Sequence, residues 1–244
     1  MTNSEKHLRQ QQRGASHMTE WDDWLRNNVP KTGGQFKLIY DLWVSSEPVY
    51  SSMFRLLPPP RKVLEVGSGF GTSTAILTLL GYDVTAVDIN PEMLSHSRRT
   101  LKLLGLAQRA RFRLGNTFDL SSHYGRYDAV FSAGVLEHFS IDKAVVALKE
   151  QAKTAKHVVI AIPTRHLGWR EEGFTGYFYP HTPLTFKAMC RKADLDILTF
   201  LAFGDPNGRT FALLRNILPY VVWRVLRKRF FAVSVAAICT SSSC

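Results

Sequence analysis

Between residues 62 and 163, short apolar runs alternate with stretches that carry helix signals. The apolar runs lie at residues 62–66, 84–89, 110–114, 127–133 and 157–163. The helical stretches lie at residues 72–80, 90–104 and 140–155. Because strands joined by helices form βαβ units, this alternation predicts an open, mostly parallel sheet with helices on both faces. The length of 244 residues is enough to bury one sizeable core.

Two local signals refine this prediction. Asn90-Pro91-Glu92 has the form of a helix start, with an N-cap residue, proline at the first helical position and an acid in the first turn. Residues 111–114 read Arg-Phe-Arg-Leu. Because charged side chains discourage one sheet from pairing with another, this alternation predicts a strand at the edge of the sheet.

The chain changes character at positions 58–60, where three consecutive prolines cannot continue a helix. Residues 1–18 are polar and lack the apolar run of a secretory signal, so we expect a flexible arm there. Residues 19–60 carry aromatic side chains among polar ones, which predicts two or three amphipathic helices. We therefore expect an arm, a helical region and a main domain over residues 61–244.

The most specific motif is a glycine-rich turn that reads E-V-G-S-G-F-G-T over residues 65–72. Glycines let a backbone approach a cofactor closely, and open α/β sheets bind ligands at the carboxyl ends of their strands. Asp88 ends the next predicted strand, where a carboxylate can accept both hydroxyl protons of a ribose. The dinucleotide fingerprint needs a small residue at position 72. This chain has threonine there, and its third glycine comes one residue early.

The pattern E-x-G-x-G-x-G followed by Asp88 resembles motif I of class I S-adenosylmethionine-dependent methyltransferases. Residues 127–138 are similar to the family's segment at the end of the fourth strand. The resemblance covers roughly residues 60 to 200. It implies a Rossmann-like, seven-stranded sheet in the order 3-2-1-4-5-7-6, with the last strand antiparallel and helices on both faces. Strand six would span residues 194–202 and the last strand residues 231–239.

The same resemblance implies S-adenosyl-L-methionine as the cofactor. The implied cofactor residues are Glu65, Gly67, Ser68 and Gly69 at the methionine end, Asp88 at the ribose, Ile89, Asn116 and Thr117 at the adenine, and Ala133 near the reacting sulfur. An asparagine side-chain oxygen can accept a hydrogen bond from the adenine amino group. The other interpretations are a plain tight turn for the glycines and a strand-end cap for Asn116.

The expected chemistry is direct displacement at a sulfonium methyl group, in which the protein mainly aligns the reactants. The motif places His138 beside the reacting centre, either as a general base or as a residue that only orients the loop. Acceptor selection is expected in a helical lid over residues 19–60 and in an insertion over residues 165–183. The candidate acceptor-binding residues of the insertion are Trp169, Tyr177, Tyr179 and His181. No metal is expected, because the chain lacks a histidine or cysteine cluster at ligand spacing.

The net charge distinguishes small-molecule enzymes from nucleic-acid enzymes less clearly than the motifs do. Lys and Arg number 31 against 20 Asp and Glu, and the net charge of +11 favours an anionic partner. The favoured function is methylation of an oxygen or nitrogen of a small-molecule metabolite. Three cysteines without disulfide or metal spacing predict a cytoplasmic protein, and no apolar stretch is long enough to span a membrane.

Three alternatives stay open. An RNA methyltransferase is favoured by the charge, but the chain has no appended RNA-binding module. The end of the fourth strand also lacks the Asn/Asp-Pro-Pro-Tyr/Phe motif of enzymes that methylate exocyclic base amines. The other two alternatives are a cofactor-binding subunit without catalysis and a dehydrogenase.

Overall fold

The computed structural model describes residues 35–164, 179, 181–203, 213–214, 216–226 and 232–241. Their core is a seven-stranded sheet in the order β3-β2-β1-β4-β5-β7-β6. The strands are β1 (Lys62–Val66), β2 (Asp83–Asp88), β3 (Ala110–Leu114), β4 (Tyr127–Ala133), β5 (Ala155–Pro163), β6 (Leu195–Phe203) and β7 (Ser234–Ser241). Strands β1 to β5 pair in parallel, whereas β7 is antiparallel to both β5 and β6. The predicted strand order and antiparallel last strand are confirmed.

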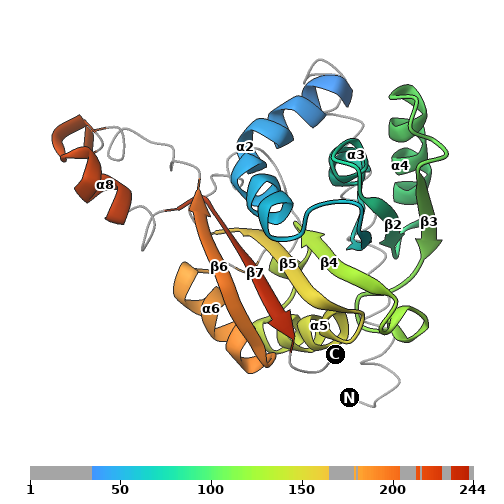
Figure 1. The fold of residues 1–244 in the computed structure, drawn as a ribbon. Coiled ribbons are helices and arrows are strands. Elements are labelled where there is room, and N and C mark those ends of the chain that lie inside the picture. Colours follow the sequence, from blue (N-terminus) through green and yellow to red (C-terminus); the bar gives the residue numbers. More distant parts are fainter. Residues whose placement is uncertain are drawn as a thin grey trace, which may run out of the picture.

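Helices cover both faces of this sheet (Figure 1). One face carries α2 (Gln35–Leu56), α3 (Thr72–Leu79) and α4 (Pro91–Leu103), and the other carries α5 (Ile141–Ala152) and α6 (Pro183–Lys192). The short helix α8 (Tyr220–Leu226) belongs to the connection between β6 and β7. Each strand packs against both helix layers, because successive side chains point to opposite faces of the sheet. Val159 packs with α2 and α3, whereas its neighbours Val158 and Ile160 pack with α5 and α6.

The local signals of the sequence act as expected. The side chain of Asn90 accepts a hydrogen bond from the Glu92 amide at 2.8 Å, which caps α4. Strand β3 lies at the sheet edge, and its Arg111 guanidinium contacts the Asp83 carboxylate at 2.7 Å. A charged side chain of this edge strand thus also pairs with its one neighbouring strand, β2.

The structure describes part of the predicted N-terminal helical region. Its described part is one 22-residue helix, α2, which continues through Pro48 and ends at Leu56, before the three prolines. Residues 1–34 lie outside the described residues. Tyr50 and Met53 of α2 are buried against α3 and the sheet, and this tertiary packing offsets the hydrogen bond that Pro48 cannot donate.

Candidate cofactor and acceptor site

The turn after β1 is built from glycines whose backbone conformation other residues rarely adopt. Gly67, Gly69 and Gly71 all have positive φ angles, of 78°, 49° and 74°. A Cβ atom on Gly67 would lie 2.3 Å from Val135 Cγ2, and one on Gly71 would lie 2.8 Å from Ser97 Cα. A Cβ atom on Gly69 would meet nothing within 4 Å. The outer two glycines therefore allow close packing within the protein, whereas the middle one borders open space.

Ser97 of α4 holds this turn by hydrogen bonds, and the sequence analysis did not identify it. The Ser97 hydroxyl donates a hydrogen bond to the Gly69 carbonyl at 2.8 Å and lies 3.3 Å from the Ser68 hydroxyl. The side chain is fully buried within α4, which begins well after the turn in the sequence. A serine inside a polar helix gives no sequence signal of such a role.

Asp88 stands at the carboxyl end of β2, next to the turn. One carboxylate oxygen accepts a hydrogen bond from the Gly69 amide and the other accepts from the Asn90 amide, both at 2.9 Å. Burial raises the pKa of Asp88, and these backbone hydrogen bonds oppose the shift. The residue predicted to hold the ribose thus also fixes the glycine turn to the start of α4.

Glu65 is the second acid at this edge. It is buried, and its carboxyl group accepts a hydrogen bond from the Thr74 hydroxyl in the first turn of α3. Burial, with a smaller contribution from the nearby charge of Asp88, raises the pKa of Glu65 to about 8, and hydrogen bonds from Thr74 oppose the shift. A cationic group beside Glu65 would favour its charged form and reverse this shift.

The predicted adenine residues follow two neighbouring strands, Ile89 directly after β2 and Asn116 and Thr117 after β3. The Ile89 side chain is mostly exposed, as an apolar surface for an aromatic ring would be. The Asn116 side-chain oxygen accepts a hydrogen bond from the Phe118 amide at 3.0 Å, so it already caps the loop that follows β3. The Thr117 hydroxyl accepts from the Gln151 side-chain amide at 3.3 Å. Gln151 is a second residue that the sequence did not reveal.

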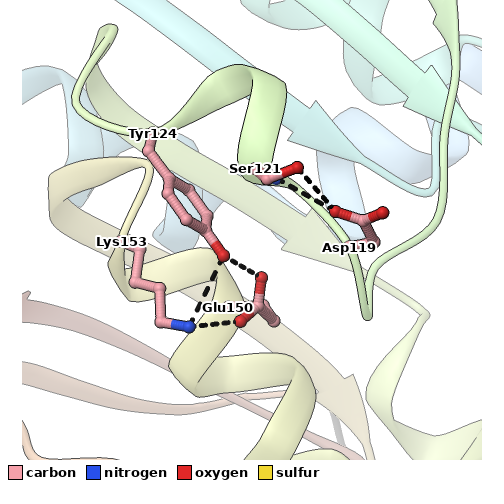
Figure 2. A network of polar contacts seen from close by, with 5 residues as sticks. All are labelled: Asp119, Ser121, Tyr124, Glu150 and Lys153. Carbon is pink, nitrogen blue, oxygen red and sulfur yellow. Dashed lines mark hydrogen bonds and ion pairs between the residues drawn. The ribbon is translucent and has the colours of Figure 1, made fainter.

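Two groups of polar contacts hold the loop after β3 in place. The fully buried Gln151 of α5 contacts Thr117 on one side and the Ser132 hydroxyl of β4 on the other, the latter at 3.1 Å. Further along the loop, a surface network joins Tyr124 to Glu150 and Lys153 at the end of α5 (Figure 2). The loop that would border the adenine is thus held by α5, which lies on the other face of the sheet from α3 and α4.

The end of β4 forms the other half of the site. After Ala133, Gly134 has a φ angle of 74° and is exposed, and a 3-10 turn follows over Leu136–His138. The Glu137 side chain is buried with Oε2 lacking a hydrogen-bond partner, and burial raises its pKa to about 8. The Glu137 carboxyl group lies close to the Gly134 backbone. His138 is half-buried and makes protein contacts.

The end of the predicted insertion closes over this turn. The Tyr179 amide donates a hydrogen bond to the Glu137 carbonyl at 2.7 Å. Burial lowers the pKa of His181, and hydrogen bonds to the backbone of Leu136 and Phe139 oppose the shift. His181 is thus buried against the turn, whereas Tyr179 stays partly exposed. Trp169 and Tyr177 lie outside the described residues.

The parts of the chain that the structure describes contain no group of three His, Cys, Asp or Glu side chains placed to bind a metal ion. Among the described helices, none is long and apolar enough to cross a membrane.

Comparison with known proteins agrees with this geometry. Residues 63–157 match the family model described as "Methyltransferase domain". The chain is 31% identical over 108 residues to the protein-L-isoaspartate O-methyltransferase of Picosynechococcus, which covers 44% of this chain and 46% of the relative. It is 33% identical over 93 residues to the ubiquinone biosynthesis O-methyltransferase of Xanthomonas axonopodis pv. citri, which covers 38% of each chain. The chain thus spans less than half the length of these curated relatives.

The fold has a solved counterpart over a greater length. The crystal structure of magnesium protoporphyrin IX methyltransferase from Synechocystis with bound SAH aligns with a TM-score of 0.64 at 18% identity. The alignment covers 94% of this chain and 97% of that one. At this identity, the likeness shows a shared fold.

Proposed function

We propose that this chain, whose residues 63–157 match the methyltransferase domain family, transfers a methyl group from S-adenosyl-L-methionine to an oxygen or nitrogen of a small molecule. The observation that carries the proposal is the arrangement at the carboxyl edge of the sheet. There, a glycine turn with positive φ angles follows the buried Glu65, and its Gly69 amide donates a hydrogen bond to the buried Asp88.

The residues at this edge fit the cofactor. Glu65 offers a buried acid to the cofactor's ammonium group, and the open space beside Gly69 leaves room for close backbone approach. Each Asp88 oxygen accepts one backbone hydrogen bond and keeps a lone pair for a ribose hydroxyl. When bound, S-adenosylmethionine supplies a methyl group activated by its sulfonium. The chain's residues orient it and exclude water.

We propose that the acceptor binds beside the Leu136–His138 turn, next to the exposed Gly134 at the end of β4. Tyr179 and His181 cover this turn, which suits a compact acceptor better than a nucleic-acid strand. Glu137 presents a buried carboxyl group that is mostly protonated at neutral pH and lacks a partner for one oxygen. The net charge of +11 supports an anionic acceptor.

The helical region over residues 19–60 is the second element that we assign to the acceptor side, as a lid. Support comes from α2, whose Tyr50 hydroxyl donates a hydrogen bond to the Ser73 hydroxyl at 2.9 Å. Ser73 lies in the first turn of α3, directly after the glycine turn. Because α2 is hydrogen-bonded to α3 at this point, a movement of the turn on cofactor binding would be passed to α2.

Calorimetry and a transfer assay test the proposal. We expect S-adenosylmethionine and its demethylated product to bind at micromolar concentrations, and NAD not to bind. With methyl-labelled cofactor, label should pass to a pool of small phenols, amines and carboxylic acids rather than to total RNA. Binding of NAD without binding of the sulfonium would contradict the proposal. Label found only in RNA would establish the alternative acceptor class.

A further inference from the structure

The connection between β6 and β7 exposes an unusual amount of apolar surface. Its described residues are 213–214 and 216–226, and six of their large apolar side chains have exposed fractions between 43% and 73%. These residues are Leu213, Ile217, Tyr220, Val221, Val222 and Val225. Large apolar side chains that are exposed within one short segment indicate a place where another apolar surface can bind.

The charges of the same segment indicate what that surface is. From position 213 to position 229 the sequence has five basic residues and no acidic residue. The basic residues are Arg215, Arg224, Arg227, Lys228 and Arg229. A segment that combines exposed valine, isoleucine and tyrosine with cationic side chains is complementary to a surface that is apolar inside and anionic outside. The net charge of +11 acts in the same direction.

The geometry fits a segment that lies on a bilayer rather than one that crosses it. Helix α8 has 7 residues, or about 10 Å at 1.5 Å per residue, against about 30 Å for the hydrocarbon core of a bilayer. Val221 and Val225 are one helical turn apart and share a face of α8. Trp223 between them is buried, so the helix keeps an inner and an outer side.

The connection that contains α8 starts at the edge of the sheet that carries the candidate site. Because β7 is antiparallel to both of its neighbours, β6 runs parallel to β5 and to β1. The connection to α8 therefore starts at the carboxyl edge of the sheet, which carries the glycine turn and the end of β4. Figure 1 shows α8 beyond the end of β6, separate from the helices that cover the two faces.

We propose that the described residues 213–214 and 216–226 dock on the surface of an anionic lipid bilayer, with the exposed side chains of α8 inserted at the interface. This docking goes beyond the proposed methyl transfer and does not depend on it. It would hold the carboxyl edge of the sheet, with the cofactor and acceptor site, close to the membrane surface.

Co-sedimentation of the full chain with lipid vesicles tests the proposal. We expect binding to vesicles of phosphatidylcholine with phosphatidylglycerol, weaker binding to phosphatidylcholine alone, and a loss of binding as the salt concentration rises. The double variant Val221→Asp, Val225→Asp should bind the anionic vesicles about tenfold more weakly or worse, because two inserted valines are replaced by anions. Ile217→Asp serves as a second variant if the double variant does not fold.

Leu103→Asp is the matched control, since Leu103 ends α4 and is 57% exposed, as Val225 is. It should bind vesicles as the parent does, and all variants should keep the circular dichroism spectrum of the parent. The proposal is overturned if the parent does not bind anionic vesicles, or if Leu103→Asp loses binding as much as the double variant. It is also overturned if light scattering shows a dimer that only the α8 variants dissociate, with no vesicle binding. The face would then join two copies of the chain.

Discussion

Asp88 combines two tasks that its position makes compatible. Its carboxylate accepts backbone hydrogen bonds from Gly69 and Asn90, which joins the glycine turn to the start of α4. The same group is our candidate for the ribose hydroxyls. The sequence indicated the second task alone, because the backbone donors become visible only when the turn is folded.

Replacing Asp88 should therefore affect both binding and stability. We expect Asp88→Ala to weaken S-adenosylmethionine binding by about 10- to 100-fold, because hydrogen bonds to a charged acceptor contribute roughly 1.5–3 kcal/mol. The free energy of unfolding should also fall, since two backbone amides lose their acceptor. Calorimetry and urea unfolding measure the two effects. Asp142→Ala, at an exposed position in the first turn of α5, is the control, and equal effects in both variants would refute a special role for Asp88.

His138 is the residue for which the catalytic and structural interpretations differ most. We expect His138→Ala to lower turnover by less than about tenfold, whereas loss of a general base costs about 10²- to 10⁴-fold. The physical reason is that a sulfonium already activates the methyl group and alignment supplies most of the rate. Turnover and cofactor affinity are measured against His157→Ala, which lies at the start of β5. A large loss of turnover with unchanged binding, together with loss of the acidic limb of the pH profile, would show that His138 is the base.

At the scale of elements, alanine variants of the glycine turn can distinguish the cost of backbone strain from the loss of space for the cofactor. Gly69, Gly71 and Gly105 all have positive φ angles, so alanine at each position should cost about 1–2 kcal/mol in strain. Gly105, at the end of α4, also has open space around it and is the matched control for Gly69.

We expect the three alanine variants to differ as follows. Gly71→Ala should destabilise the fold the most, because its methyl group would collide with the Ser97 backbone at 2.8 Å. Gly69→Ala and Gly105→Ala should lose similar stability, but Gly69→Ala alone of these two should lose cofactor affinity. Urea unfolding and calorimetry measure both quantities. Equal affinity in the Gly69→Ala and Gly105→Ala variants would place the cofactor elsewhere.

The two sets of contacts that fasten the loop after β3 should differ in strength. Gln151 is fully buried between Thr117 and Ser132, so Gln151→Ala should lower the free energy of unfolding by about 2 kcal/mol or more. Lys153→Ala removes part of the exposed network of Figure 2 and should cost much less, because solvent screens surface ion pairs. Chemical unfolding of both variants tests this. A larger loss in Lys153→Ala would mean that the surface network holds the loop.

For the whole molecule, the buried acids predict how stability depends on pH. Burial raises the pKa values of Glu65 and Glu137 from about 4.5 to about 8. Between these values the native state binds more protons than the unfolded state. Both acids therefore make stability fall as the pH rises through this window.

We expect the cofactor-free chain to lose less stability between pH 5.5 and pH 8.5 when both acids are replaced by glutamine. Urea unfolding of the parent and of Glu65→Gln, Glu137→Gln at the two pH values measures the difference. Glu150→Gln is the control, because Glu150 lies near the surface and its pKa is lowered rather than raised. An unchanged pH dependence in the double variant would mean that these acids are charged in the native state.

The fold could largely be predicted from the sequence, and so could the position of the glycine turn and of Asp88 at the carboxyl edge of the sheet. Strand order follows from the family pattern, and the positions of β3 and β4 agree with the apolar runs at residues 110–114 and 127–133. The glycine spacing and Asp88 lie within short stretches whose geometry is set by local backbone preference. Such features depend on neighbours in the chain, so the sequence alone carries them.

Tertiary structure alone decided the features that depend on residues far apart in the chain. Ser97 reaches Gly69, and Gln151 reaches Thr117, only after helices pack on the sheet. The burial of His181 against the turn after β4 was likewise hidden, because a histidine in an aromatic segment resembles a binding residue until its surroundings are known. The physical reason is that burial and hydrogen bonding between distant segments are set by packing, for which composition and spacing provide no local signal.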